Sequence, residues 1–364
     1  MRDQRIDFWR GLCVVGMAVW HMLSHTSFPR WFTFPLIQGL NFVAEGFVLV
    51  SGVCVGLGFS RHVPGSLRCG HYLRRAVWIL TVHYMMVSVL WVGAWAGVIR
   101  IPYWPPLSGQ SIGHRLWAIV SLADQPYLAD ILSLFFFLFL TTPIFLFLLH
   151  KVGAWGLAGI GFLIYLGTIA FAWAAPSWHR LWELNADGAF DWNSWQWVYG
   201  IGIVLGAGYA RWEPARAASW ARKTVGWVGL AWLAMAGLYL ALKLHFPASH
   251  PVQKFLLDRH PLGPVRLGYI GLQLALIGLG VVAWWETLQP FRFARLLVFF
   301  GRHSLTVFVC SVFLDYLFKQ AIDRWQIEFP IGLLFVAAEL VLLAGLAWAA
   351  DKWPSAGKNP PAAP

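Results

Sequence analysis

Ten apolar runs, each close to the length that crosses a membrane as a helix, divide this sequence. A helix rises ~1.5 Å per residue, so about 20 apolar residues span the ~30 Å of hydrocarbon in a bilayer. Because no water satisfies backbone polar groups at that depth, each run must form a helix. The runs lie near residues 8–24, 36–59, 76–98, 129–149, 154–174, 195–210, 224–242, 265–285, 296–318 and 329–350. The sequence therefore predicts an all-α, polytopic membrane protein with about ten transmembrane helices.

Composition supports this fold class and argues against a nucleic-acid-binding protein. Of the 364 residues, 59% are hydrophobic and only 12% are charged, and the mean hydropathy is +0.62. A formal net charge of +11 would suit nucleic acid, but no basic domain lies outside the apolar runs. Membrane topology and anionic lipid headgroups explain the charge better. We therefore expect membrane lipid, and no nucleic acid, among the partners.

The distribution of Lys and Arg predicts the orientation of the chain. Cytoplasmic loops of membrane proteins are enriched in these residues. With the N-terminus inside, the short loops 60–75 and 211–223 lie inside, and the inside segments hold most of the 27 Lys and Arg residues. Both termini are therefore expected in the cytoplasm. We expect one transmembrane domain over residues 1–353 and, because residues 354–364 are rich in Pro, Ala and Lys, a disordered cytoplasmic tail.

The first apolar run carries three ionisable residues. Asp7 lies one turn before Arg10, and His21 follows Arg10 by eleven positions, which on a helix is about three turns and ~16 Å of rise. The three side chains then point to nearly the same face. Ionisable groups inside a membrane span are costly, so this stripe marks an interior cavity or pathway. The alternative is a snorkelling Arg10 and a His21 that is only hydrogen-bonded.

A second acidic residue is expected at the depth of His21. Counting helical rise from the ends of the first two runs places His21 and Glu45 together in the outer half of the membrane. A carboxylate beside an imidazole holds one tautomer and stabilises the imidazolium, so we expect the two to pair. A bond from Glu45 to a helix dipole or a hydroxyl is the alternative. Ser51 adds a local polar group, while the spacing of Gly52 and Gly56 indicates tight helix packing.

Two further cationic residues open the ninth run. Arg302 and His303 lie ~10 Å from its cytoplasmic end, in the same half of the membrane as Arg10. Two guanidinium groups there suit a phosphate-rich cytosolic donor, because their planar forks match phosphate oxygens and stay charged. Snorkelling to lipid phosphates is the alternative. His83 in the third run and Asp130 at the outer end of the fourth are further candidates for lining the same cavity.

Nothing in the sequence indicates a bound metal or cofactor. The four cysteines, Cys13, Cys54, Cys69 and Cys310, lack the C-x-x-C spacing of zinc sites, which also disfavours a disulfide framework. Walker A, Rossmann, G-x-S-x-G and H-E-x-x-H motifs are missing in any usable context. We therefore expect chemistry that amino-acid side chains perform by themselves.

At this point the residues support a family resemblance. The opening segment RDQRIDFWRGL with His21 resembles the membrane acyltransferase-3 superfamily, in which an Arg-Gly near the start of the first helix is followed by a His eleven residues after the Arg. The chain is most similar to the OpgC-type branch, the succinyltransferases of osmoregulated periplasmic glucans. The similar stretches are AEGFVLVSG at 44–52, QPYLADILSL at 125–134, FDWNSWQWVYGIGIVLG at 190–206, HPLGPVRLGY at 260–269 and GRHSLTVFVCSVFLDYL at 301–317. The resemblance therefore runs nearly end to end.

The resemblance implies an enzyme of the bacterial inner membrane. Members take an acyl group from a cytosolic donor, usually an acyl-CoA such as succinyl-CoA or acetyl-CoA, and esterify a sugar hydroxyl of a periplasmic glucan. On this chain His21 would be the general base, assisted by Glu45, and an acyl-histidine intermediate is the alternative. Arg10 and Arg302 would hold the CoA phosphates or counter developing negative charge. The full set of candidate substrate-binding residues is Asp7, Arg10, Ser51, His83, Asp130, Arg302 and His303.

Two positions depart from the family pattern. Trp20 stands where OpgC-type proteins are expected to carry an acid before the histidine. Cys310 and Ser311 stand where many relatives in the wider superfamily carry a late-helix histidine. These departures leave His21 and Arg10 in place, and they leave the identity of the substrate open.

Two other functions fit the same sequence features. One is an acetyltransferase that modifies a surface polysaccharide or a lipid-linked glycan. The other is a transporter or flippase that moves a glycan through the polar cavity and forms no bond. A transporter consumes no acyl-CoA, and replacing His21 by Gln would then cost it only part of its activity.

Overall fold

The structure is a computed structural model whose described residues form helices and connecting turns. It describes residues 3–24, 38–60, 69–99, 128–175, 190–247, 249–259, 261–327 and 329–352, with positions 29 and 101 and eight positions between 113 and 126. Within these residues the structure has eleven helices whose bounds are given: α1 Gln4–Ser24, α3 Val43–Ser60, α4 Cys69–Trp95, α6 Asp130–Ala174, α8 Trp192–Tyr209, α9 Pro214–His245, α10 Pro251–Leu257, α11 Pro264–Leu288, α12 Arg292–Arg302, α13 Ser304–Trp325 and α14 Phe329–Lys352. The all-α prediction is confirmed for this part of the chain. The expected tail at 354–364 lies outside the described residues.

Eight of these helices are long and apolar enough to cross a membrane: α1, α3, α4, α6, α9, α11, α13 and α14. The ten predicted runs map onto them in order, with three exceptions. The run near 296–318 covers most of α12 as well as α13, and α12 is not among the eight. Helix α6 covers two predicted runs, and α8, which covers the run near 195–210, is not among the eight. The chain is therefore a multi-pass helical membrane protein.

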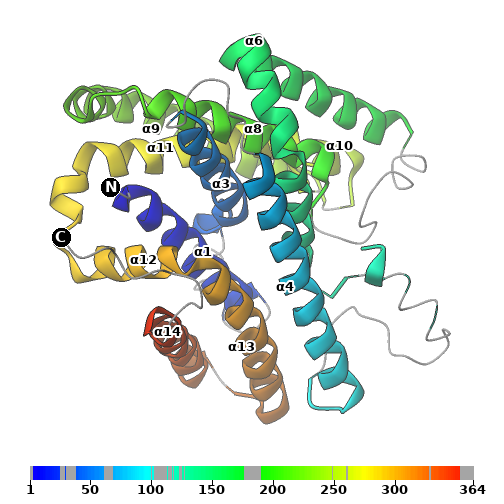
Figure 1. Ribbon diagram of the computed structural model, residues 1–364. Coiled ribbons are helices and arrows are strands. Elements are labelled where there is room, and N and C mark those ends of the chain that lie inside the picture. The colour runs from blue at the N-terminus through cyan, green and yellow to red at the C-terminus, as the bar shows by residue number, and fades with distance from the viewer. Residues whose placement is uncertain are drawn as a thin grey trace. The chain divides into compact units, whose positions relative to one another are not determined.

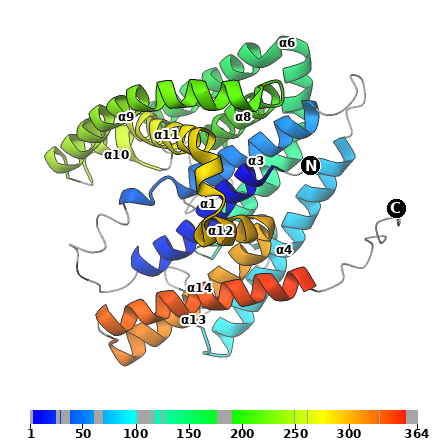
Figure 2. The ribbon, with the colours of Figure 1, turned by 90° about the vertical axis from the view of Figure 1, so that its left-hand side faces the viewer.

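Helix α6 is two helices joined at a kink. Its 45 residues would rise ~68 Å if straight, about twice the hydrocarbon thickness. Gly153 interrupts it with φ 73° and ψ −177°, a conformation that glycine adopts without the steric cost of a Cβ. The break falls between the predicted runs that end near 149 and begin near 154, and the bend is visible in Figure 2. Each half is long enough for one crossing.

The chain divides into two compact units. Unit 1 combines the N-terminal segment Met1–Val43 with the C-terminal segment Gln289–Pro364, and unit 2 is the continuous segment Ala44–Leu288. Unit 1 therefore depends on contacts between the two ends of the sequence. Its helices are α1, α12, α13 and α14.

In unit 1, α1 packs against both α12 and α13, and α13 packs against α14. Glycines allow the closest of these approaches. A Cβ on Gly11 would overlap the backbone carbonyl of Leu297, and one on Gly301 would overlap that of Asp7. The touching backbones also bring Arg302 of α12 within 4.0 Å of Asp7 on α1.

In unit 2, α9 packs along α11, and α6 packs against both α4 and α8. Figure 1 shows α9 in green beside α11 in yellow. Helix α3 meets α8 through glycines, because a Cβ on Gly52 or Gly56 would overlap backbone atoms of Tyr199 or Ile203. The prediction that Gly52 and Gly56 serve tight helix packing is confirmed.

Large apolar side chains cover much of the outside. Trp155 is 92% exposed, Leu244 77% and Trp227 75%. In water such a surface would be unfavourable, whereas in a bilayer these side chains face lipid tails. Several acidic residues are instead buried among the helices, including Asp7, Glu45, Asp130, Asp315 and Glu339. Buried ionisable groups in a membrane protein mark candidate functional positions.

Candidate active site

His21 lies beside a carboxylate in unit 1. It occupies the last turn of α1, and its Nδ1 lies 3.4 Å from Oδ2 of Asp315 on α13. Both side chains are largely shielded, at 13% and 7% exposed. A carboxylate at Nδ1 favours the tautomer with its proton on Nδ1, which leaves Nε2 as the proton acceptor.

Asp315 was not among the candidates drawn from the sequence. The available signal was a lone acid within the ninth apolar run, in the segment SVFLDYL. Its sequence separation from His21 hides the pairing until the two ends of the chain are placed together in unit 1. Its position inside a membrane-spanning helix, α13, was the feature that could have drawn attention to it.

Arg10 is anchored to the same pair of helices. Its Nη2 donates a hydrogen bond of 2.6 Å to Oγ of Ser304, the first residue of α13. The Nε–H of Arg10 is buried and has no acceptor among the described residues. Arg10 and His21 are separated by eleven positions, and so are Ser304 and Asp315. Helices α1 and α13 therefore run in the same direction with one constant register, which places the two contacts ~16 Å apart.

Arg302 and Asp7 also meet, a contact that the sequence did not predict. Nε of Arg302 lies 4.0 Å from Oδ2 of Asp7, and the Arg302 side chain remains 46% exposed. His303 points elsewhere, with Nε2 3.3 Å from Oδ1 of Asp351 at the end of α14. Helix α12 ends at Arg302 and α13 starts at Ser304. At this break Arg302 points toward α1 and His303 points toward the end of α14.

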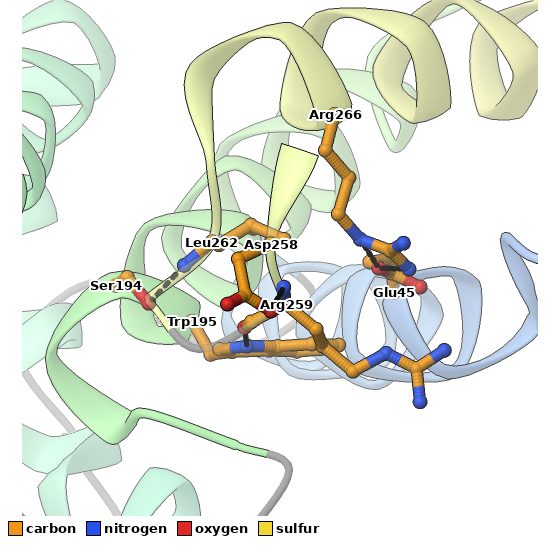
Figure 3. A network of polar contacts seen from close by, with 7 residues as sticks. All are labelled: Glu45, Ser194, Trp195, Asp258, Arg259, Leu262 and Arg266. Atoms are coloured by element: carbon orange, nitrogen blue, oxygen red, sulfur yellow. Dashed lines mark hydrogen bonds and ion pairs between the residues drawn. The ribbon is translucent and has the colours of Figure 1, made fainter. Parts of the chain in front are cut away.

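Glu45 is held by an arginine in unit 2. Arg266 near the start of α11 donates to one carboxylate oxygen of Glu45 from both Nε, at 3.1 Å, and Nη2, at 2.7 Å (Figure 3). The side chains are 6% and 1% exposed. Glu45 lies in the first turn of α3, so the starts of α3 and α11 lie at the same level. The predicted pairing of Glu45 with His21 stays a prediction, because His21 belongs to unit 1.

The Glu45–Arg266 pair adjoins a segment that α8 holds in place (Figure 3). Oγ of Ser194 accepts from the Leu262 amide at 3.2 Å, and Nε1 of Trp195 donates to the carbonyl of Arg259 at 3.4 Å. Asp258 accepts from the Arg259 amide at 2.7 Å. Three of the stretches similar to OpgC-type proteins, those within 44–52, 190–206 and 260–269, therefore meet in space within unit 2.

The remaining candidates have local partners. Oγ of Ser51 donates to the carbonyl of Phe47 one turn earlier, at 2.8 Å, a bond that occupies the hydroxyl within its own helix. His83 is fully buried on α4 and faces the backbone of Ala129, the residue before Asp130. The structure thus brings His83 and the start of α6 together. Among the described residues, no group of three or more His, Cys, Asp and Glu side chains is arranged to hold a metal ion.

Fold and site together define a class of protein: a multi-pass helical membrane protein whose interior holds a shielded His–Asp pair and, at a second level of the same two helices, Arg10 bonded to Ser304. The chain matches the OpgC protein family over residues 2–355 and belongs to it. Membership implies an acyltransferase of the type that succinylates osmoregulated periplasmic glucans. No curated protein and no solved structure matches the chain.

Proposed function

We propose that this protein transfers an acyl group, with succinyl favoured, from a cytosolic acyl-CoA to a hydroxyl of a periplasmic glucan. The observation that carries the proposal is the shared register of α1 and α13, which sets the Arg10–Ser304 contact ~16 Å from the His21–Asp315 pair. An extended pantetheine arm separates the phosphates of CoA from its thioester by a comparable length. The family supports a location in the bacterial inner membrane, and the distribution of Lys and Arg supports cytoplasmic termini.

In the proposed reaction His21 is the general base. Its Nε2 takes the proton of the sugar hydroxyl while the oxygen attacks the thioester carbonyl. The C–S bond then breaks, the imidazolium returns the proton to the departing CoA thiolate, and an ester remains on the sugar. Asp315 stabilises the imidazolium while it exists. An acyl-histidine intermediate is the second route, and it would be seen as acyl transfer to His21 without a glucan.

Arg10 and Arg302 are proposed to bind the phosphates of CoA. Arg10 has an Nε–H without an acceptor among the described residues beside its bond to Ser304, and the Arg302 side chain is half exposed. Guanidinium groups bind phosphate through two parallel hydrogen bonds and remain charged when water is excluded. Asp7 would hold Arg302 in place until the donor arrives.

The test is turnover of purified protein in liposomes supplied with succinyl-CoA or acetyl-CoA and a short β-glucan. We expect release of free CoA, a matching increase in glucan mass and a higher rate with succinyl-CoA. His21→Ala should abolish both signals while inserting normally. Glucan that crosses the bilayer without release of CoA would instead identify a transporter, and preference for acetyl-CoA would identify the acetyltransferase alternative.

A further inference from the structure

A second buried carboxyl group lies behind the His21–Asp315 pair. Glu339 on α14 is 0% exposed, and neither of its carboxyl oxygens has a hydrogen-bond partner among the described residues. It interacts electrostatically with Asp315 on the neighbouring helix. The mechanism above gives Glu339 no role, yet a buried carboxyl in a membrane helix is costly and marks a functional position.

Helix geometry places the two carboxyls at one level. Helix α13 ends at Trp325 and α14 begins at Phe329, so the two form an antiparallel hairpin with a short connection. Asp315 lies ten residues before the end of α13, and Glu339 lies ten residues after the start of α14. Each is therefore ~15 Å from the connection. Both are buried, and the two carboxyls interact electrostatically, so they lie near each other where α13 packs against α14.

Two enclosed carboxyls at one level cannot both be ionised without a large cost, so one of them holds a proton. The surroundings decide which. Asp315 faces His21 from α1 and also interacts with Lys319 one turn later on α13. Among the described residues, Asp315 is the charged side chain that interacts with Glu339. Charge is therefore favoured on Asp315, and the proton is favoured on Glu339.

We propose that Glu339 is a positioning residue whose carboxyl O–H donates a hydrogen bond to the Asp315 carboxylate, which in turn holds Nδ1–H of His21. The proposal rests on the proposed function, in which His21 is the general base. The donor on Glu339 fixes the direction of the Asp315 carboxylate and so the direction in which Nε2 of His21 points. The proton on Glu339 stays on that carboxyl throughout the reaction.

The experiment compares Glu339→Gln and Glu339→Leu. The Gln amide retains a donor at the same place, so Glu339→Gln should keep turnover within about threefold of wild type. Leu retains the bulk and removes the donor, so turnover should fall about tenfold or more with little change in KM for succinyl-CoA. Equal turnover of both variants would overturn the proposal, whether both are normal or both are equally impaired. Glu286→Gln, at an exposed position on α11, is the matched control.

The dependence on pH supplies a readout that a merely structural role would not move. As pH rises, wild type loses the proton on Glu339, and a second negative charge then repels the Asp315 carboxylate, so activity falls on the alkaline side. Gln has no proton to lose, so in Glu339→Gln the fall of kcat/KM at alkaline pH should move to higher pH or disappear. The fall at acid pH, which is set by His21, should stay where it is. An unchanged alkaline limb contradicts the proposal, and this test remains informative if Glu339→Leu fails to fold.

The two proposals fail in different ways. If His21→Ala turns over succinyl-CoA as fast as wild type, the proposed function is wrong whatever Glu339 does. If His21→Ala is inactive and the Glu339 variants match wild type in rate and pH profile, only the role of Glu339 is wrong.

Discussion

At the scale of single residues, the proposed mechanism gives Asp315 the role of setting which nitrogen of His21 accepts a proton. An acid at Nδ1 keeps a proton there and makes Nε2 the nitrogen that accepts one, whereas an amide at the same place would let the ring adopt either tautomer. We expect Asp315→Asn to lower kcat about 10- to 100-fold with KM for succinyl-CoA nearly unchanged, because the partner matters most when charge builds on the imidazole.

The control for this prediction is Asp351→Asn. Asp351 also pairs with a histidine, His303, at 3.3 Å, but it is 62% exposed at the end of α14. Exposed ion pairs contribute little, so its removal should leave turnover unchanged. Normal turnover of Asp315→Asn in steady-state assays would show that Asp315 does not orient His21.

Arg10 provides a second prediction at this scale. Lys keeps the charge but loses the planar fork that lets Arg10 bond Ser304 and present a further N–H to a ligand. Arg10→Lys should therefore raise KM for succinyl-CoA about tenfold, equivalent to ~1.4 kcal/mol of binding free energy. Arg302→Ala should act in the same direction.

Arg216→Lys is the control for the arginine variants, because Arg216 forms an exposed pair with Glu213 outside the candidate site. If neither Arg10→Lys nor Arg302→Ala changes KM for the donor, the arginines do not clamp its phosphates, and the snorkelling interpretation is favoured.

At the scale of elements, the contact between α1 and α12 determines whether Arg10 and Ser304 meet. A methyl group on Gly11 would overlap the backbone of Leu297, so the helices must separate. Gly11→Ala should lower the free energy of unfolding by about 1–3 kcal/mol, the usual cost of overpacking, and weaken acyl-CoA binding as well.

The control is Gly237→Ala on α9, where a Cβ meets no atom within 4 Å. It should be neutral in the same thermal unfolding and binding assays. If Gly11→Ala and Gly237→Ala have the same stability and the same affinity for acyl-CoA, the close contact between α1 and α12 does not determine the geometry of the site.

The sequence predicts most elements but not their interruptions. Apolar runs define α1, α3, α4, α9, α11 and α14 because the bilayer imposes both a length and a helical backbone. The run near 296–318 instead forms α12 and α13, separated at His303, which has φ −109° and ψ 24°. Two residues before that break, Gly301 packs against α1, a contact between distant segments that hydropathy does not encode.

Predicting the candidate site from sequence had the same limit. His21, Arg10, Arg302 and Glu45 stand out in the sequence because charge inside an apolar run is rare. Their partners Asp315, Ser304 and Arg266 lie more than 200 positions away, and only tertiary packing selects them from other polar residues. Arg266 in particular is indistinguishable in sequence from an interfacial arginine, yet it is fully enclosed and paired.

At the scale of the whole molecule, the conspicuous polar pairs fall in different units. Unit 1 holds His21 with Asp315 and is built from the two ends of the chain, so its site forms only after the last helices are in place. Unit 2 is continuous and holds Glu45 with Arg266. Substitutions in the Glu45–Arg266 pair can therefore be distinguished from substitutions in the His21–Asp315 pair by measuring stability and turnover separately.

The final prediction concerns Glu45, for which sequence and structure suggest different partners. As the partner of Arg266, Glu45 balances a buried charge. Removing either residue alone should then destabilise the protein by about 3–5 kcal/mol, and removing both should cost less than the sum of the two. As the partner predicted for His21, Glu45 should instead affect turnover. Glu45→Gln would then lower kcat more than it weakens donor binding, and the double variant Glu45→Gln/His21→Ala would be little slower than His21→Ala alone.

Two sets of measurements separate the two roles. Thermal unfolding is compared for Glu45→Gln, Arg266→Gln and their double variant, and turnover is compared for Glu45→Gln, His21→Ala and their double variant. We expect coupling in stability between Glu45 and Arg266, whose hydrogen bonds are direct. Additive losses of stability would contradict this, and a kinetic coupling to His21 would show that Glu45 also serves the catalytic base.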